Sequence, residues 1–211
     1  MAVHRPASRF GGRRTWRDLG ALVLALAATA GAAVLWYRSG LLVNHTASLP
    51  VGLYRVTRLT AAERDAAAAG RLAPLRGAVV VWCLPDDVAA VGRRRGYLLR
   101  GPCPGDVEPV LKHVAAVPGD TVVVNAGGLA VDGGLLANSR ALARDARGRP
   151  TSPVPPGIYA VTAGTVWLWS PYTPRSFDSR YYGAVTASGW LGVARPLWTR
   201  RPAMPINPRA P

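Results

Sequence analysis

PVLKHVAAVPGDTVVVNAGGLAVDGGLLA, residues 109–137, carries the clearest fold signal in this chain. Its first part, 109–117, places β-branched and apolar residues on both sides of one lysine, which predicts a buried strand. The part from 120 to 137 alternates valine-rich runs with glycine pairs, which predicts a hairpin with turns at the glycines. The PGD at 118–120 is a turn between the two. These patterns predict a mostly β domain.

Segments on either side extend this interpretation. Residues 77–84, GAVVVWCL, form another buried-strand run, and 157–170, GIYAVTAGTVWLWS, predict two strands around an Ala-Gly pair. Residues 143–156 are polar and proline-rich, which is typical of a loop. With glycine and proline turns throughout, about 170 residues fit one compact β core.

One short helix is expected within the β domain, at residues 60–70, TAAERDAAAAG. Thr60 is placed as an N-cap, Glu63 stands at the capping-box position, and Gly70 is expected at the C-cap.

Positive charge is carried almost entirely by arginine. The formal net charge is +15, and of the 26 basic residues only Lys112 is a lysine. Because the guanidinium pKa is too high for arginine to lose its proton in a protein, a lone lysine in this background suggests an amine that must become neutral. Survival of one lysine by chance is the alternative.

The basic balance does not predict nucleic-acid binding. Arg93, Arg94 and Arg95 form the only run of three basic residues, and this run is interpreted as a solvated loop. No DNA- or RNA-binding signature accompanies it. With three histidines and no CxxC, neither a metal site nor a cofactor is expected. Cys83 and Cys103 form a disulfide if the domain lies outside the reducing cytoplasm; two buried free thiols are the alternative.

Residues 19–37, LGALVLALAATAGAAVLWY, contain no charge and predict a membrane-spanning helix about 28 Å long. Five arginines precede it within 1–18, and Trp16, Trp36 and Tyr37 flank its ends. The positive-inside rule therefore predicts a cytoplasmic basic tail at 1–18, an anchor at 19–37 and the remainder outside.

Two alternatives to a retained anchor are a cleaved signal peptide, because ATAGAA offers small-residue cleavage sites, and a buried core helix, which would need a polar face. The apolar run continues past ATAGAA to Tyr37, which favours the anchor. The expected layout then continues with an extracytoplasmic domain at 38–201 and a flexible tail at 202–211.

Chemistry is predicted around Ser48 and Lys112. Because neighbours in a strand point to opposite faces, only one of Lys112 and His113 can face a given site. If Lys112 faces inward, its apolar flanks desolvate the amine and lower its pKa. A neutral amine can accept the proton of a serine hydroxyl, which is the Ser–Lys form of nucleophilic catalysis.

Three segments together carry a family resemblance: TASLPVGLYR at 46–55, LKHVAAVPGD at 111–120 and SFDSRYYG at 176–183. In this order, behind an apolar helix, they resemble the signature boxes of the bacterial type I signal peptidases, and are most similar to the TraF-type conjugative-transfer peptidases. The similarity spans residues 36 to about 198. It implies a signal-peptidase-like antiparallel β domain behind one N-terminal transmembrane helix.

The resemblance implies a role for each matching residue. Ser48 would be the nucleophile and Lys112 the general base. Thr46, two positions earlier, would assist the Ser48 N–H as the oxyanion hole. Ser176 would hydrogen-bond the lysine amine, and Asp178, which the family needs, would pair with Arg180 and orient the surroundings of the lysine. A turn with a local ion pair at 178–180 is the simpler alternative.

Two departures from the family pattern stand out. Pro50 comes one residue sooner after the serine than in the secretory enzymes, as in the conjugative branch. His113 replaces the usual arginine after the lysine, which puts an ion pair between that position and Asp178 in doubt.

The sequence thus predicts a serine endopeptidase in the bacterial inner membrane, with its catalytic domain outside and a pilin or other conjugative-transfer precursor as substrate. The expected partners are precursor proteins and the lipid bilayer. The family also implies that the substrate binds by strand addition beside Ser48 and Lys112. The alternatives are a general signal peptidase, a non-catalytic membrane-anchored assembly protein and, more remotely, a self-cleaving Ser–Lys repressor.

Overall fold

The protein divides into two compact units, residues 1–40 and 41–211, in a computed structural model that describes residues 12–71 and 75–200. Of the predicted tails, 202–211 and the first eleven residues of 1–18 lie outside the described residues.

The first unit consists of one helix, α1, from Gly12 to Ser39. Its window Asp18–Leu35 has a mean hydropathy of 1.9, and among the described residues it is the single helix long and apolar enough to cross a membrane. The helix starts before the apolar run at 19–37, because the preceding arginines are good helix formers. An anchor and a signal sequence both satisfy this description.

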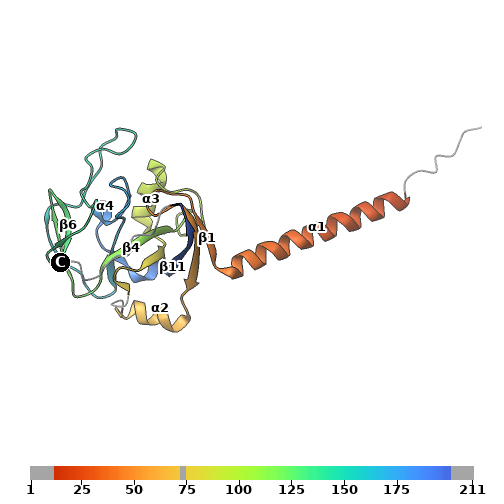
Figure 1. Cartoon of the computed structure of the whole chain (residues 1–211), viewed down its shortest axis with the longest axis horizontal. Coiled ribbons are helices and arrows are strands. Elements are labelled where there is room, and N and C mark those ends of the chain that lie inside the picture. The colour runs from red at the N-terminus through yellow and green to blue at the C-terminus, as the bar shows by residue number, and fades with distance from the viewer. Residues whose placement is uncertain (1–11, 72–74, 201–211) are drawn as a thin grey trace, which may run out of the picture. The chain divides into compact units, whose positions relative to one another are not determined.

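The second unit is mostly β, as predicted, and Figure 1 labels its main elements. Its strands, in chain order, are β1 Leu41–Asn44, β2 Gly52–Arg58, β3 Val79–Trp82, β4 Val110–Ala116, β5 Thr121–Asn125, β6 Gly128–Val131, β7 Gly134–Leu135, β8 Gly157–Ala160, β9 Thr165–Trp169, β10 Val185–Thr186 and β11 Trp190–Thr199. Its short helices are α2 Ala61–Ala68, α3 Asp86–Arg95, α4 Ser179–Tyr182 and the 3-10 turn η2 Ala187–Gly189.

The strands form two sheets. The larger has seven strands in the order β1-β2-β11-β3-β4-β9-β10, and the smaller has four in the order β7-β6-β5-β8. All pairs are antiparallel. Strand β4 lies between β3 and β9, with Lys112 opposite Val80 and His113 opposite both Val79 and Trp169. The strand with the lone lysine is therefore inside the sheet, with neighbours on both edges.

Three apolar clusters support these sheets. The largest packs β3, β4 and β9 with α3, a second lies against the small sheet around Val122 and Trp167, and a third surrounds Tyr54 on β2. The third cluster also contains Leu49, which directly follows Ser48. Burying an apolar side chain of this size contributes about 1.5–3 kcal/mol, so Leu49 anchors the serine turn to the core.

Most predicted elements are present. Thr60 caps α2 and forms the capping box with Glu63. The C-cap, however, is Ala69, and Gly70 follows it with φ +83°, because the left-handed residue stands one place beyond the cap.

The prediction that Arg93, Arg94 and Arg95 lie in a loop was wrong, because they form the last turn of α3. Basic side chains there complement the helix dipole, and Gly96 ends the helix in the left-handed conformation.

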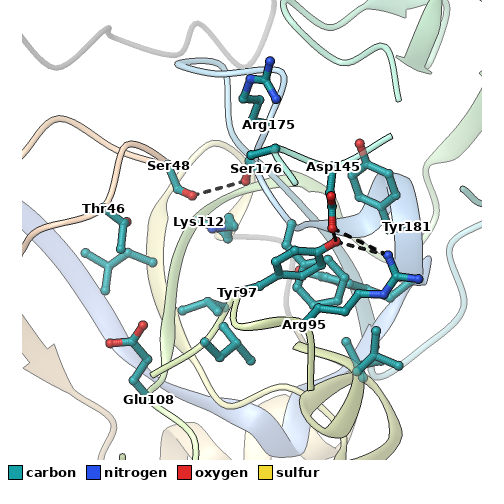
Figure 2. A pocket seen from close by; sticks show the side chains of 18 of the residues that line it. Thr46, Ser48, Arg95, Tyr97, Glu108, Lys112, Asp145, Arg175, Ser176 and Tyr181 are labelled. Carbon is teal, nitrogen blue, oxygen red and sulfur yellow. Dashed lines mark hydrogen bonds and ion pairs between the residues drawn. The ribbon is translucent and has the colours of Figure 1, made fainter. Parts of the chain in front are cut away.

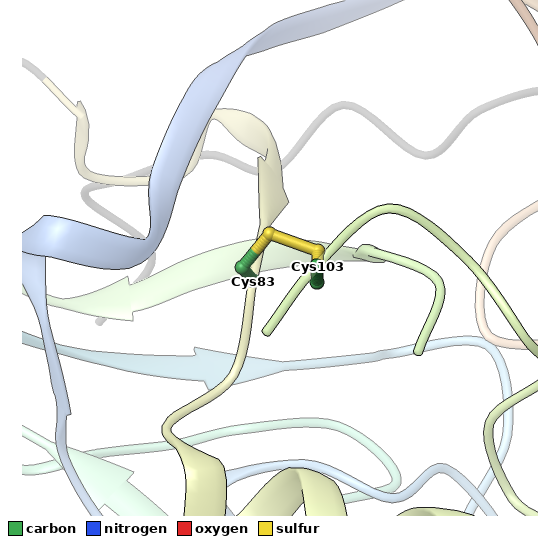
Figure 3. Close-up of a disulfide and its surroundings, with 2 residues drawn as sticks. All are labelled: Cys83 and Cys103. Atoms are coloured by element: carbon green, nitrogen blue, oxygen red, sulfur yellow. A yellow bond between two sulfur atoms is a disulfide. The ribbon is translucent and has the colours of Figure 1, made fainter. Parts of the chain in front are cut away.

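Cys83 and Cys103 are joined in a disulfide, with Cα atoms 5.5 Å apart and twenty residues of separation (Figure 3). The bridge closes a loop of chain that contains the whole of α3. It therefore ties the connection before β4 to the end of β3, next to the strand that carries Lys112.

Candidate active site

Ser48 lies on a tight turn between β1 and β2 that is organised by Asn44. The buried Asn44 amide donates to the carbonyls of Thr46, Leu49 and Pro50 at 3.0, 3.0 and 3.1 Å. Its Oδ1 accepts from the Thr46 N–H at 3.1 Å, an Asx turn. One side chain thus holds the backbone on both sides of the serine.

Thr46 is beside Ser48, as the sequence requires, but its hydroxyl donates to Asn44 Oδ1 at 2.9 Å. In this arrangement it stabilises the turn. The assignment of an oxyanion-hole role to Thr46 and the Ser48 N–H stays a prediction.

Lys112 points inward from β4 and is only 4% exposed. Burial lowers the pKa of its amine from 10.5 to about 8. The negative charges of Asp178 and Glu108 raise the pKa and the positive charge of Arg180 lowers it, both by less than burial does. Much of the amine is therefore neutral at mildly alkaline pH and able to accept a proton.

His113 faces the other side of β4. Its ring lies against Trp169 and Tyr172, with centroids 6.4 and 6.0 Å apart, and Nδ1 is 3.3 Å from the Gly77 carbonyl oxygen. Burial lowers the pKa of His113 to about 4, so the ring is neutral at physiological pH. Asp178 pairs with Arg180 instead.

Ser176 is far from Ser48 in sequence but lies beside it in the structure. Ser48 Oγ donates to Ser176 Oγ at 3.4 Å (Figure 2), and Ser170 Oγ donates to the Ser48 carbonyl oxygen. Both partners are at most 2% exposed. The serine turn is thus held on the side of the 170–176 segment as well as by Asn44.

Arg180 organises the segment that carries Ser176. It pairs with Asp178 through Nε–Oδ1 at 2.7 Å and Nη2–Oδ2 at 2.8 Å, and both residues are almost fully buried. Its remaining N–H groups donate to backbone carbonyls, namely those of Asn138, Arg140, Thr173, Pro174 and Ser176. A planar guanidinium has the five donors that this set of contacts requires, and a lysine in place of Arg180 could not make them.

A single cavity of about 850 Å³ brings the predicted residues together: Thr46, Ser48, Lys112 and Ser176 all line it. Asp178 and Arg180 are outside its lining and act on it through the backbone that they hold. Among the residues that the structure describes, no group of three His, Cys, Asp or Glu side chains could hold a metal ion.

Sequence reasoning missed Asn44 and Ser170. An asparagine two residues before a threonine in a turn is a usable local signal for Asn44. No local pattern indicates Ser170, because its contact with Ser48 spans 122 positions of sequence.

Comparisons with known proteins agree on one family. The family model described as signal peptidase, peptidase S26, matches residues 13–198. The plasmid transfer protein TraF of Escherichia coli is 37% identical over 81% of this chain and 88% of its own length. The probable conjugal transfer protein TraF of Sinorhizobium fredii is 36% identical, covering 87% and 90%, and the conjugal transfer protein TraF of Agrobacterium fabrum is 35% identical, covering 90% and 98%.

A solved signal peptidase I from Enterococcus faecalis is 19% identical with a TM-score of 0.31, over 56% of this chain and 93% of that one. The match to the family model, residues 13–198, extends over the serine turn, β4 and the 176–183 segment. This chain therefore belongs to the signal peptidase family, peptidase S26.

Proposed function

We propose that this chain is a membrane-anchored serine endopeptidase in which Ser48 is the nucleophile and Lys112 the general base. The observation that carries the proposal is the placement of a buried amine, with its pKa lowered to about 8, in the same cavity as the Ser48 hydroxyl. It is also the only lysine in the chain.

The proposed reaction follows from these groups. Neutral Lys112 takes the proton of Ser48 Oγ, and the oxygen attacks the carbonyl carbon of the scissile amide. The resulting ammonium then gives its proton to the leaving nitrogen, the C–N bond breaks, and an acyl-serine remains. Attack by a water, with Lys112 again acting as base, releases the acid. The Ser48 N–H is the proposed donor to the oxyanion, where such a donor contributes about 2.7–4 kcal/mol.

Ser176, Asp178 and Arg180 are proposed as positioning residues. Ser176 contacts the Ser48 hydroxyl, and the Asp178–Arg180 pair holds the Ser176 carbonyl. Fixed geometry of this kind avoids the cost of orienting the reactants during each turnover.

The proposed substrates are precursor proteins of conjugative transfer, with a pilin precursor as the first choice. Support comes from the names of the relatives, which are plasmid and conjugal transfer proteins. The apolar run of α1, which five arginines precede in the sequence, supports an anchor in the cytoplasmic membrane with the β unit on the outer side. A nucleophile eleven residues beyond Tyr37 would then act close to the lipid surface.

Co-expression with a pilin precursor tests this proposal. Mass spectrometry of the precursor is expected to show cleavage with the wild-type chain and none with Ser48→Ala or Lys112→Arg, because arginine keeps its proton. Processing that survives Lys112→Arg would contradict the dyad, and full processing by both variants would favour a non-catalytic assembly protein. Equal cleavage of a generic Ala-x-Ala preprotein would instead favour a general signal peptidase.

A further inference from the structure

The cavity does not end at Ser48 and Lys112. It continues to a second region between α3 and the segment 142–152, which we term the distal lobe. Its main apolar lining is Val88, Val91, Tyr97, Leu142, Phe177 and Tyr182. A cavity of about 850 Å³ lies at the upper end of the range for ligand sites, about 300–1,000 Å³, and far exceeds the needs of one alanine-sized side chain.

Helix α3 supplies one wall of the distal lobe through a single face. Val88, Val91 and Arg95 recur at three- and four-residue spacing, so they lie along the same side of the helix. Val88 also packs against the main core, which fixes the position of this wall.

Aromatic rings form another part of the lining. The ring of Phe177 lies 5.1 Å from that of Tyr97 and 5.2 Å from that of Tyr182, the latter in an edge-on arrangement. Such lining favours large apolar or aromatic groups, because offset and edge-on ring pairs add stabilisation beyond burial alone.

The segment 142–152 is tied to α3 by a polar clasp, and Figure 2 shows its contacts at Tyr97, Arg95 and Asp145. Tyr97 Oη and Arg149 Nε each donate to Asp145 Oδ2 at 2.7 Å. Arg149 Nη2 donates to the Arg95 carbonyl oxygen, and Arg95 Nη1 to the Pro150 carbonyl oxygen, both at 2.7 Å. The Asp145 side chain is 7% exposed. These contacts preform the lobe before any ligand enters.

We propose that the distal lobe is a specificity subsite that receives one bulky apolar side chain, such as phenylalanine, of the peptide bound at Ser48. The inference rests on the proposed function, because the occupant is identified by the continuity of the lobe with the Ser48 cavity. Tyr97 and Asp145 are positioning residues that keep the lobe open.

Fluorogenic quenched peptides test this proposal with the purified full-length chain in detergent micelles. The parent peptide carries alanine at the three positions on each side of the cleaved bond, and phenylalanine replaces each alanine in turn. At one position phenylalanine is expected to raise kcat/KM about 10-fold or more over alanine. A peptide set that is cleaved with no such position would overturn the subsite and leave the peptidase proposal intact.

Filling the lobe supplies the matched comparison. Val91→Trp is expected to bring the Phe/Ala ratio of kcat/KM close to one. Ile158→Trp, a similar change at a residue that is 77% exposed on β8 and outside the cavity lining, is expected to keep the wild-type ratio. Equal ratios in both variants would contradict the location of the subsite.

The clasp variants separate positioning from general damage. Asp145→Asn and Tyr97→Phe are expected to raise KM for the preferred phenylalanine peptide several-fold while changing kcat little. A loss of kcat that is equal for the alanine and phenylalanine peptides would show that these residues only support the fold.

A binding measurement keeps the inference testable if no peptide is cleaved. Fluorescence anisotropy with the Ser48→Ala chain is expected to show about 10-fold tighter binding of one labelled phenylalanine peptide than of the alanine parent. Val91→Trp in the same background should abolish the difference. Tighter binding of the phenylalanine peptide, with no cleavage by the wild-type chain, would contradict the peptidase proposal alone. Cleavage or binding with no preference for phenylalanine over alanine would contradict the subsite.

Discussion

Arg180 and Asp178 form a two-point ion pair in the interior, with both side chains at most 1% exposed and the guanidinium also bonded to the Ser176 carbonyl oxygen. This pair connects the buried core to the segment that contacts Ser48. In a pair this deeply buried, each charge depends on the other for compensation, because removing one partner leaves an uncompensated charge in the interior.

Removing the arginine should therefore be costly. Arg180→Met is expected to lower the free energy of unfolding by about 3–5 kcal/mol, measured by denaturant titration of the full chain in micelles. The control is Arg93→Met, because the Arg93–Asp106 pair is exposed and such pairs contribute about 0–1 kcal/mol. Equal midpoints for the two variants would contradict the hub role of Arg180.

The buried amine of Lys112 makes stability depend on pH in a defined direction. Burial lowers the pKa of Lys112 from 10.5 to about 8, so between these values the unfolded chain binds more protons than the folded chain. The cost of burying the amine is thus full below pH 8 and fades as the pH rises toward 10.5. Lys112→Met should raise the free energy of unfolding by about 3 kcal/mol at pH 7, and this gain should shrink toward pH 10.5.

Thermal or chemical unfolding of wild type and Lys112→Met at several pH values checks this. Burial raises the pKa of Tyr54 to about 12, so the stability of both chains also depends on tyrosine ionisation. Because this contribution is the same in wild type and Lys112→Met, comparing the two at each pH cancels it. A gain of constant size from pH 7 to 10 would show that the amine is not the source.

Asn44 is expected to contribute both to stability and to catalysis, because it holds the turn that carries Ser48. Asn44→Ala leaves buried carbonyls without their donor, which costs about 1–3 kcal/mol, and it should lower kcat because Ser48 loses its fixed position. Asn125→Ala, at an exposed turn of the small sheet, is the control and should do neither. Wild-type kcat in the Asn44→Ala chain would remove Asn44 from the positioning of Ser48.

The Cys83–Cys103 bridge should contribute stability through the loop that it closes. For a loop of this length the expected loss in the Cys83→Ala/Cys103→Ala chain is about 3 kcal/mol, and hydrogen exchange should accelerate first in α3, which lies inside the loop. Thiol trapping of unfolded, unreduced protein should find no free thiol. Two trapped thiols would contradict the bridge.

The fold was predictable where the signal is local. The valine runs of β3 to β6 and the Thr60–Glu63 capping box depend on neighbours in sequence, and both are present. Helix α3 was missed because its arginine-rich end hides a narrow apolar face. Such a face becomes recognisable only when the partner surface is known.

The candidate site was predictable only in part. The three boxes indicated Ser48, Lys112 and Ser176. The sequence alone does not reveal that Ser48 and Ser176, which are 128 positions apart, form a hydrogen bond. The Tyr97–Asp145 contact spans 48 positions and has no pattern of its own. Long-range contacts of this kind follow from sheet order and loop packing, which a single sequence does not specify.

Because Lys112 is the only lysine, the state of its amine can be measured directly. Full-length protein labelled with ¹³C/¹⁵N-lysine should give one side-chain resonance, whose titration should have a midpoint near pH 8, and kcat/KM for a cleaved peptide should rise with the same midpoint. A midpoint near the ordinary 10.5, or a rate that is flat from pH 6 to 10, would contradict a desolvated lysine acting as the base for Ser48.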